Sequence, residues 1–332
     1  MAVVIPNWNG IEHIFECLDS VMKMEYTNFD VILVDNDSKD GSPEAVALRF
    51  PMVHIMRNSR NLGFAEGCNI GIEQAISNGV DYVWLLNNDV LVDPGALGGL
   101  VRAAENDQRI GMTGSKVFFY DDPQVLWGVG MNISWIRGET YPIGWREVDH
   151  GQLDECRAVD GLAGCSLLVK REVCETVGLM DKRYFLYAEE IDWCVRARKQ
   201  GFRCVVVPES IVFHKEGASS GEDFRPIFSY YNTRNMLFTI SKNFSFPTRE
   251  FYLCTVIICK LWKSRRNLAK ALIVKLTGSK RFSFDVSAML GVMDFITRQR
   301  GMKSRSAIMA FQNLREVAQS GEIPDDIAQP RA

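Results

Sequence analysis

The N-terminal part of the chain alternates short apolar runs with amphipathic segments, and this alternation constrains the fold more than any other feature. In chain order, strands and helices are expected in turn at residues 3–5, 11–24, 31–34, 43–50, 53–56, 64–78 and 82–86. Strand runs without polar alternation are typical of a parallel sheet buried on both faces. The pattern therefore predicts an α/β fold, a doubly wound and mostly parallel sheet with helices on both faces.

Later segments are less regular. Residues 109–147 suggest several short strands and turns, and a return to the sheet is expected at 159–170, with a helix at 191–200 and a strand at 204–207. Beyond residue 241 the chain becomes helical and basic.

Polar side chains follow all four expected strands. They include Asn7, Asp35, Asn61 and Asp89. Ligands of doubly wound sheets bind beyond the carboxyl ends of the strands, so these side chains are expected to face one cleft. Turn chemistry would explain any single Asn or Asp in such a place. Four polar strand ends in succession favour a binding site.

Asp89 is the strongest candidate for a metal ligand. It ends the segment LLNND, which would bring a carboxylate from a buried strand into the cleft. A hard cation that bridges two phosphates takes only one or two ligands from the protein. The neutral neighbours Asn87 and Asn88 suit such a site, because the phosphates supply the remaining negative charge. Asp35 could accept a hydrogen bond from the imide N–H of a pyrimidine base.

Three glycines, Gly63, Gly67 and Gly71, are spaced by four residues on one face of the third expected helix. Each costs roughly 1 kcal/mol relative to alanine, so this face is expected to let another backbone or a ligand approach closely. The spacing is not G-x-G-x-x-G, and the sequence therefore lacks the fingerprint of a nicotinamide-dinucleotide site.

The second half contributes an acidic cluster and a histidine. Glu189, Glu190 and Asp192 lie where a helix begins, and this segment alone is best explained by charges that complement the helix dipole. His214 follows a short apolar run and is a candidate for a functional imidazole.

These segments together resemble the family 2 glycosyltransferases, especially the bacterial branch that contains rhamnosyltransferases. The matching segments lie in order between residues 3 and 235 and include VVIPNWNG, ILVDNDSKDGS, NLGFAEGCNIGI, WLLNNDV, FLYAEEIDWCVRARKQGF, VFHKEGASSG and YYNTRN. The resemblance implies a GT-A fold over residues 1–240, with a nucleotide-binding half at about 1–100 and an acceptor half at about 101–240. Residues 241–332 would form a basic helical appendage.

The resemblance also implies an inverting transfer of a sugar from a nucleotide-diphosphate donor to a hydroxyl. The acceptor would be a saccharide or lipid-linked molecule of cell-surface polysaccharide synthesis, and rhamnose is the first expectation for the sugar. Position by position, Asp89 and His214 would bind Mg²⁺ or Mn²⁺. The expected donor-binding residues are Pro6, Asn7, Asp35, Asn61, Asn69, Asn88 and Asp89.

Glu190 takes the place of the family's general base, where most members have aspartate, and Asp192 remains an alternative. A helix N-terminus is expected to hold such a carboxylate ionised at neutral pH. Lys215 and Arg234 are candidates to offset the charge that develops on the leaving diphosphate.

The C-terminal region is strongly basic. Between residues 251 and 305 there are twelve lysines and arginines against two aspartates, interleaved with large apolar residues over 251–275. A helix of this kind suits a membrane interface, and it equally suits packing on the catalytic domain. A nucleic-acid partner is not expected, because no binding module accompanies the charge. The pattern does not indicate an oligomeric state.

The compartment is expected to be the cytoplasm, with possible peripheral attachment to the inner face of the plasma membrane. The nine cysteines show no C-x-x-C pair and suggest reduced thiols. The start of the chain lacks the pattern of a signal peptide. A silent nucleotide-sugar-binding scaffold is the alternative to an active enzyme, because Glu190 departs from the family's usual base.

Overall fold

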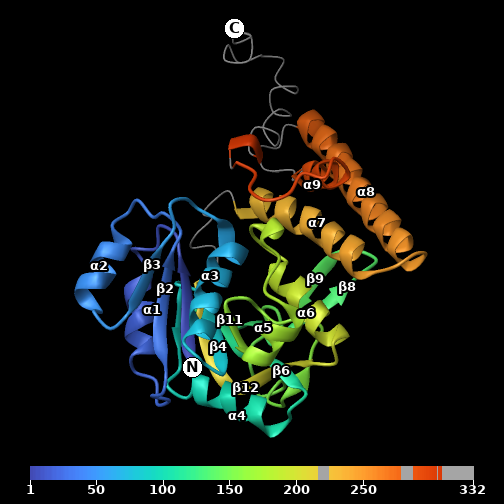
Figure 1. Ribbon diagram of the computed structural model, residues 1–332. Helices are drawn as coiled ribbons and strands as arrows, with labels where there is room; N and C mark the ends of the chain where they lie inside the picture. Colours follow the sequence, from blue (N-terminus) through green and yellow to red (C-terminus); the bar gives the residue numbers. More distant parts are fainter. Residues whose placement is uncertain (216–223, 278–286, 305, 309–332) are drawn as a thin grey trace. The chain divides into compact units, whose positions relative to one another are not determined.

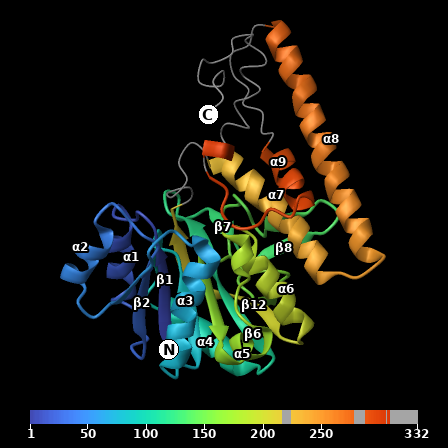
Figure 2. The same ribbon diagram turned by 45° about the horizontal axis from the view of Figure 1, so that its top comes forward.

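A computed structural model describes residues 1–215, 224–277, 287–304 and 306–308. Figures 1 and 2 show the chain from two directions. It divides into two compact units, one of Met1–Ser134 with Thr140–Ser219 and one of Trp135–Glu139 with Ser220–Ala332. The expected domain boundary at residue 240 lies within the second unit.

The first unit begins with the alternation that the sequence predicts. In chain order the elements are β1 (Ala2–Asn7), α1 (Ile14–Val21), β2 (Asp30–Asp35), α2 (Ser42–Arg49), β3 (His54–Arg57), α3 (Gly63–Ser77), β4 (Tyr82–Leu86), β5 (Val90–Val92) and α4 (Ala96–Asn106). All four expected strands and all three expected helices of this part are confirmed, with ends that differ by a few residues.

The second half of this unit completes the sheet. It contains β6 (Ile110–Phe119), β7 (Leu126–Gly128), β8 (Met131–Ser134), β10 (Arg157–Ala158), β11 (Ser166–Lys170), α5 (Arg171–Val177), the 3₁₀ helix η1 (Lys182–Tyr184), α6 (Glu189–Lys199) and β12 (Arg203–His214). β8 pairs with β9 (Glu139–Pro142) in a small separate sheet.

The main sheet has the order β10-β12-β6-β11-β4-β1-β2-β3, and β5 and β7 pair at its sides with β12 and β6. The pairs β1–β2, β1–β4, β2–β3 and β6–β12 are parallel. β11 runs antiparallel to both of its neighbours, β4 and β6. The expected doubly wound, mostly parallel sheet is therefore confirmed, with antiparallel strands added in its second half.

Helices cover both faces of this sheet (Figure 1). α3, α5 and α6 share one hydrophobic core with alternate sheet residues such as Val4 and Met112. The neighbouring residue Thr113 points to the other face, where its hydroxyl donates to the backbone oxygen of Leu100 in α4 at 3.4 Å. Successive strand residues face opposite sides, so α4 and α3 lie on different faces.

Two sheet segments differ from expectation. β6 is a buried strand of 10 residues in a region expected to be irregular, and β11 covers only the end of the expected 159–170 segment. Polar residues interrupt the apolar pattern of β6 and so obscure the strand in the sequence. One of them, Ser115, is buried, and its hydroxyl lies 2.6 Å from the Ser166 hydroxyl and 2.7 Å from the Ser210 hydroxyl. Internal hydrogen bonds allow these hydroxyls to be buried in the sheet.

The described C-terminal residues of the second unit are mostly helical, as expected, and residues 278–286 and 309–332 of the expected appendage lie outside the described residues. It contains α7 (Phe224–Asn243), α8 (Thr248–Thr277) and α9 (Ser287–Ile296). Leu237 of α7, Val256 of α8 and Val292 of α9 share a small hydrophobic core. None of the helices in the described residues combines the length and apolarity that crossing a bilayer requires.

Candidate active site

The carboxyl ends of β1, β2 and β4 are joined by a network of buried amides and a carboxylate. The amide nitrogen of Asn7, at the end of β1, lies 3.3 Å from Asp35 Oδ1 and 2.9 Å from Ser42 Oγ. Asn88 donates to Asn7 Oδ1 at 2.8 Å. Ser38 N donates to the other oxygen of Asp35 at 3.2 Å. Each carboxylate oxygen of Asp35 can therefore accept a further hydrogen bond from a ligand.

Asp89 and His214 lie together although they are far apart in the sequence. Asp89 Oδ1 is 3.4 Å from His214 Nε2, and both side chains are largely buried. The antiparallel pairing of β5 with the end of β12 produces this contact, since His214 pairs with Val90. Lys215 N also donates to the Asp89 backbone oxygen at 3.1 Å. The sheet therefore fixes both backbones at the site.

The Asp89–His214 pair has the donor atoms for one divalent cation. Asp89 Oδ1 is buried and has no hydrogen-bond partner among the described residues. A buried carboxylate oxygen without a partner is costly unless a ligand satisfies it. Two ligands at neighbouring positions of Mg²⁺ lie roughly 3 Å apart, close to the observed separation. No described group of three or more His, Cys, Asp or Glu side chains is placed to hold a metal, so a cation here would take its other ligands from substrate or water.

Glu190 lies at the start of α6 and is half-buried. Burial raises the pKa of its carboxyl to about 7. With a pKa of about 7 the group is about half ionised at neutral pH, and not fully ionised as the helix N-terminus suggested, because loss of water outweighs the backbone N–H groups that stabilise the charge. A carboxylate with a pKa near neutrality has the basicity that general base catalysis requires.

The thiol of Cys165 links Glu190 to the Asp89 side of the site. The pKa of this thiol is raised chiefly by burial and then by the negative charges of Asp89 and Glu190. Its backbone oxygen also accepts from Asn87 N at 3.0 Å. A Cβ atom at Gly164, the residue before Cys165, would lie 3.5 Å from Glu190 Cγ. This segment therefore lies against Glu190 on one side and Asn87 on the other, so Asp89, His214 and Glu190 belong to one region of the first unit.

The other two acids of the cluster have different surroundings. Asp192 is fully buried and accepts from Arg196 Nε at 2.8 Å, four residues further along α6. Arg196 in turn donates to the backbone oxygens of Val177 and Leu179. This ion pair anchors α6 to the preceding loop, and this structural role explains why an acidic residue is buried at position 192. Glu189 is buried as well, and burial raises its pKa well above the ordinary value.

The remaining expected donor-binding residues lie at the same edge or nearby. Pro6 is in β1 opposite Val34, and Asn61 caps the turn before α3 by accepting from Gly63 N at 2.8 Å. Asn69 exchanges two hydrogen bonds with the backbone of Met180, at 2.7 and 3.1 Å. Its amide therefore holds α3 to the loop before η1, and its part in donor binding stays a prediction.

The glycine stripe on α3 serves close packing, as expected. A Cβ atom at Gly71 would lie 2.3 Å from Val4 Cγ1, and one at Gly67 would lie 2.7 Å from Asn36 Nδ2. Gly63 has a positive φ of 84° and lies against the backbone oxygen of Phe185. The stripe therefore brings α3 against the sheet beside the site.

The two expected basic residues differ in placement. Lys215 follows His214, forms an ion pair with Glu16 of α1 and lies 4.5 Å from the centre of the Tyr120 ring. It is therefore next to the Asp89–His214 pair. Arg234 is buried in the second unit, where it donates to the Gly301 backbone oxygen at 2.7 Å and contacts the Tyr230 and Tyr231 rings. These contacts explain the burial of Arg234 by a structural role within the second unit.

An aromatic cluster beside His214 was not expected from the sequence. The Trp127 ring meets the imidazole edge to face at 5.5 Å, and Trp145 and Phe119 continue the contact at 5.7 and 5.2 Å between ring centres. The only sequence signal was the frequency of aromatic residues in 109–147. Their contact arises from strand pairing, which that pattern does not reveal.

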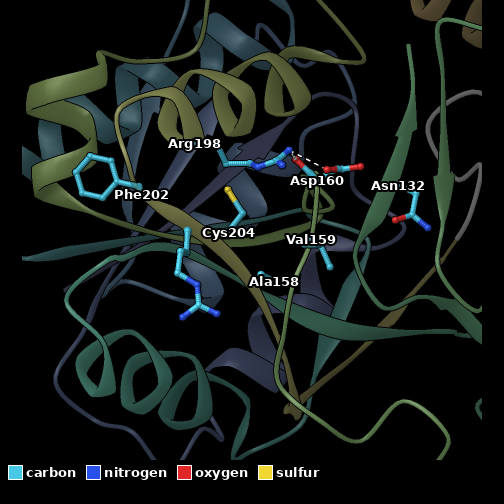
Figure 3. A pocket seen from close by; sticks show the side chains of 8 residues that line it. Asn132, Ala158, Val159, Asp160, Arg198, Phe202 and Cys204 are labelled. Atoms are coloured by element: carbon cyan, nitrogen blue, oxygen red, sulfur yellow. Dashed lines mark hydrogen bonds and ion pairs between the residues drawn. The ribbon is translucent and has the colours of Figure 1, made fainter. Parts of the chain in front are cut away.

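A surface pocket lies elsewhere on the first unit (Figure 3). It is lined by Asn132, Ala158, Val159, Asp160, Arg198, Phe202, Arg203 and Cys204. Arg198 and Asp160 point toward each other across it at 2.9 Å. Arg203 and Cys204 begin β12, and His214 ends it, so the pocket and the Asp89–His214 pair lie at opposite ends of this 12-residue strand.

Comparison with known proteins identifies the family. The family model "Glycosyl transferase family 2" matches residues 2–177. The chain is 31% identical, over 67% of its length and 78% of the relative, to an N-acetylglucosaminyl-diphospho-decaprenol L-rhamnosyltransferase of Mycobacterium tuberculosis. It is 24% identical, over 67% of its length and 74% of the relative, to the dTDP-rhamnosyl transferase RfbF of Shigella flexneri.

Among solved structures, GalNAc-T7 with UDP, GalNAc and Mn²⁺ resembles the fold with a TM-score of 0.60 and 16% identity, covering 95% of this chain and 57% of that protein. This likeness confirms the expected GT-A architecture. Together with the family match, it shows that the chain is a family 2 glycosyltransferase of the rhamnosyltransferase-like branch.

Proposed function

We propose that this glycosyltransferase is an inverting enzyme that binds one divalent cation with Asp89 and His214 and uses Glu190 as its general base. The observation that carries this proposal is the contact between the two proposed metal ligands. They come from segments far apart in the chain, yet Asp89 Oδ1 and His214 Nε2 are 3.4 Å apart. The unpartnered carboxylate oxygen supports a cation as the missing partner.

The donor would bind along the carboxyl edge of the sheet. Asp35 would accept from the base of the nucleotide, and Asn7 and Asn88 would hold Asp35 and the LLNND turn in fixed positions through their mutual hydrogen bonds. Pro6 and Asn61 would line the nucleoside, and Asn69 would act through its support of α3. The bound cation would neutralise charge on the diphosphate oxygens.

In the proposed transfer, Glu190 removes the proton of the acceptor hydroxyl as its oxygen bonds to the anomeric carbon. The bond between that carbon and the diphosphate oxygen breaks, and its electron pair leaves with the nucleoside diphosphate. The pKa of Glu190, raised to about 7 by burial, supports this role because the carboxylate is both available and basic near neutral pH. Asp192 is the weaker candidate, since its carboxylate is fully buried in an ion pair.

The printed names of the relatives suggest the substrates. We infer dTDP-rhamnose as the first donor to test, with UDP-hexoses next, and a lipid-linked or polysaccharide acceptor. Mn²⁺ is the first metal to test, because the GalNAc-T7 structure contains it, with Mg²⁺ second.

The test is a panel of nucleotide sugars added to the full chain with and without Mn²⁺. A ligand that binds only the folded protein raises the melting temperature, so the true donor should stabilise the protein more with Mn²⁺ than without it. Transfer to an acceptor, or hydrolysis of that donor, is then measured for Glu190→Gln. Loss of turnover with retained donor binding supports the proposal. A wild-type protein that binds the donor and never turns it over would favour the silent scaffold.

We also propose that α8 attaches the enzyme to an anionic membrane surface, at the inner face of the plasma membrane. One face of α8 packs into the second unit through Val256, and Lys260 pairs with Glu139 at 2.8 Å. Phe251, Ile258, Leu261 and Trp262 remain exposed on the helix. Such apolar side chains beside basic residues suit the boundary between headgroups and acyl chains.

Vesicle co-sedimentation tests the attachment. The wild-type chain should bind phosphatidylglycerol vesicles and should lose binding with Ile258→Glu and Trp262→Glu together. Leu48→Glu, on an exposed position of α2, is the matched control. Equal binding by the double variant and the wild type would contradict the attachment through α8.

A further inference from the structure

The aromatic cluster next to His214 is a series of contacting rings that begins at the proposed metal site. Trp127 lies on β7, and its ring is 5.5 Å from the His214 imidazole. Phe119 at the end of β6 is the sheet partner of His214. Trp145 contacts both Trp127 and Phe119 edge to face. Trp127 is therefore the member of the cluster that contacts the proposed metal ligand His214.

The segment that carries Trp145 is held rigidly. Ile143 exchanges backbone hydrogen bonds with Val129 and Gly130, both at 2.9 Å. Leu126 exchanges two more with Arg146 and Glu147, also at 2.9 Å. These four bonds tie the segment to β7 and its flanks on both sides of Trp145. The indole is therefore positioned before any ligand arrives, which reduces the entropy cost of binding.

Arg146 is held in a constrained conformation beside this ring. Its φ is 61°, in the left-handed region that residues other than glycine seldom adopt. Its guanidinium lies over the Trp145 ring at 5.6 Å and over the Phe119 ring at 5.8 Å. The guanidinium of Arg146 covers part of these two rings, and this cation–π contact helps to fix the orientation of Trp145.

Two features of the cluster indicate a ligand. Trp145 is 37% exposed in spite of its two aromatic contacts. The Trp127 indole nitrogen is buried and has no hydrogen-bond partner among the described residues. A buried indole N–H usually finds an acceptor, because leaving it unpaired costs free energy. A ligand that offers an apolar face to one ring and a hydroxyl or ring oxygen to the N–H would satisfy both features.

We propose that Trp127 and Trp145 form the wall that binds the sugar ring of the nucleotide-sugar donor. The C–H face of a pyranose packs on the indole rings, and an oxygen of the sugar accepts from Trp127 Nε1. The assignment to the donor rests on the proposed function, because the donor's sugar is covalently joined to the diphosphate that Asp89 and His214 hold. A 6-deoxy sugar such as rhamnose carries a methyl group in place of the hydroxymethyl group of a hexose, and an aromatic wall accommodates this apolar group well.

The test compares dTDP with dTDP-rhamnose, each with Mn²⁺, by titration calorimetry on the full chain. In Trp127→Phe the ring remains and the N–H is lost, and in Trp145→Ala the outer ring is lost. Each should weaken dTDP-rhamnose binding roughly threefold to tenfold and leave dTDP binding unchanged. Trp145→Phe should recover most of the loss, and unchanged dTDP binding by Trp145→Ala shows that its effect is not a folding defect. Leu48→Ala, an exposed apolar position on α2, should change neither affinity.

Any of four outcomes would overturn the proposal. Equal losses for dTDP and dTDP-rhamnose would place the two tryptophans at the diphosphate. Unchanged donor affinity with a raised KM for the acceptor would place the wall at the acceptor. If neither the donor affinity nor the acceptor KM changed, the two tryptophans would not take part in binding. A wild-type protein that binds no nucleotide with Mn²⁺ would instead contradict the proposed metal and donor site. The proposal that the two tryptophans bind the donor's sugar would then be wrong as well.

Discussion

Replacing Glu190 by glutamine should stabilise the fold at high pH while abolishing turnover. Burial raises the pKa of this carboxyl from 4.5 to about 7. Between these two values the folded protein binds more protons than the unfolded chain, so the contribution of Glu190 to stability falls as the pH rises. Above pH 7 the buried charge costs at most about 3 kcal/mol, and below the unfolded pKa it costs nothing.

Urea unfolding of the wild type and of Glu190→Gln, at pH 5 and pH 8, measures this effect. The variant should gain stability at pH 8, by up to about 3 kcal/mol, and much less at pH 5. Glu73→Gln, at an exposed position of α3, is the matched control and should gain nothing at either pH. The kcat/KM of the wild type should rise with pH and level off above about 7, as expected for a base that must lose its proton.

Two results together would contradict a buried Glu190 that acts as the base. If Glu190→Gln were no more stable than the wild type at pH 8, the carboxylate would not be buried at a cost. If the pH–rate profile were also flat between pH 5 and 8, no group with this pKa would take part in the reaction. A stabilised variant that keeps full turnover would instead move the base to another residue.

Further predictions concern the metal site and the packing around it. Asp89→Asn should remove the extra thermal stabilisation that Mn²⁺ gives with the donor nucleotide, and a melting curve that still responds to Mn²⁺ would contradict Asp89 as a ligand. Asp192→Ala should destabilise the protein by about 3 kcal/mol in urea, because Arg196 would lose its buried partner; an unchanged midpoint would show that the ion pair contributes nothing. Gly71→Ala should lower the free energy of unfolding by roughly 1–3 kcal/mol, since the added Cβ would overlap Val4. Gly79→Ala is the comparison, because its side chain has room and only the strain of its positive φ is tested.

The first half of the fold could be predicted because each strand there is an uninterrupted apolar run. β6 could not, since Thr113, Ser115 and Lys116 interrupt its pattern, and only contacts with distant segments explain their burial. Lys116, for example, is paired with Asp149 and Asp154 at 2.6 Å.

The candidate site shows the same division. Polar residues at the strand ends indicated Asn7, Asp35 and Asp89 from the residues alone, whereas the pairing of Asp89 with His214 followed only from the resemblance to a family. The raised pKa of Glu190 could not be predicted, because the sequence shows a helix start and does not show how much water the fold excludes. The Trp127–Trp145 wall depends on backbone pairing between segments that no sequence pattern connects.

The position of His214 depends on an irregularity in the strand that carries it. β12 keeps one register with β6 from Cys204, opposite Met112, to Val207, opposite Ser115, and resumes with Ile211 opposite Lys116. Residues 208–210 are therefore extra on β12, and Pro208 suits such a break because it has no N–H to donate to the ladder. Ser210 is buried there and contacts Ser115. An odd number of inserted residues changes which face each later side chain takes, so the bulge determines that His214, and not its neighbour, meets Asp89.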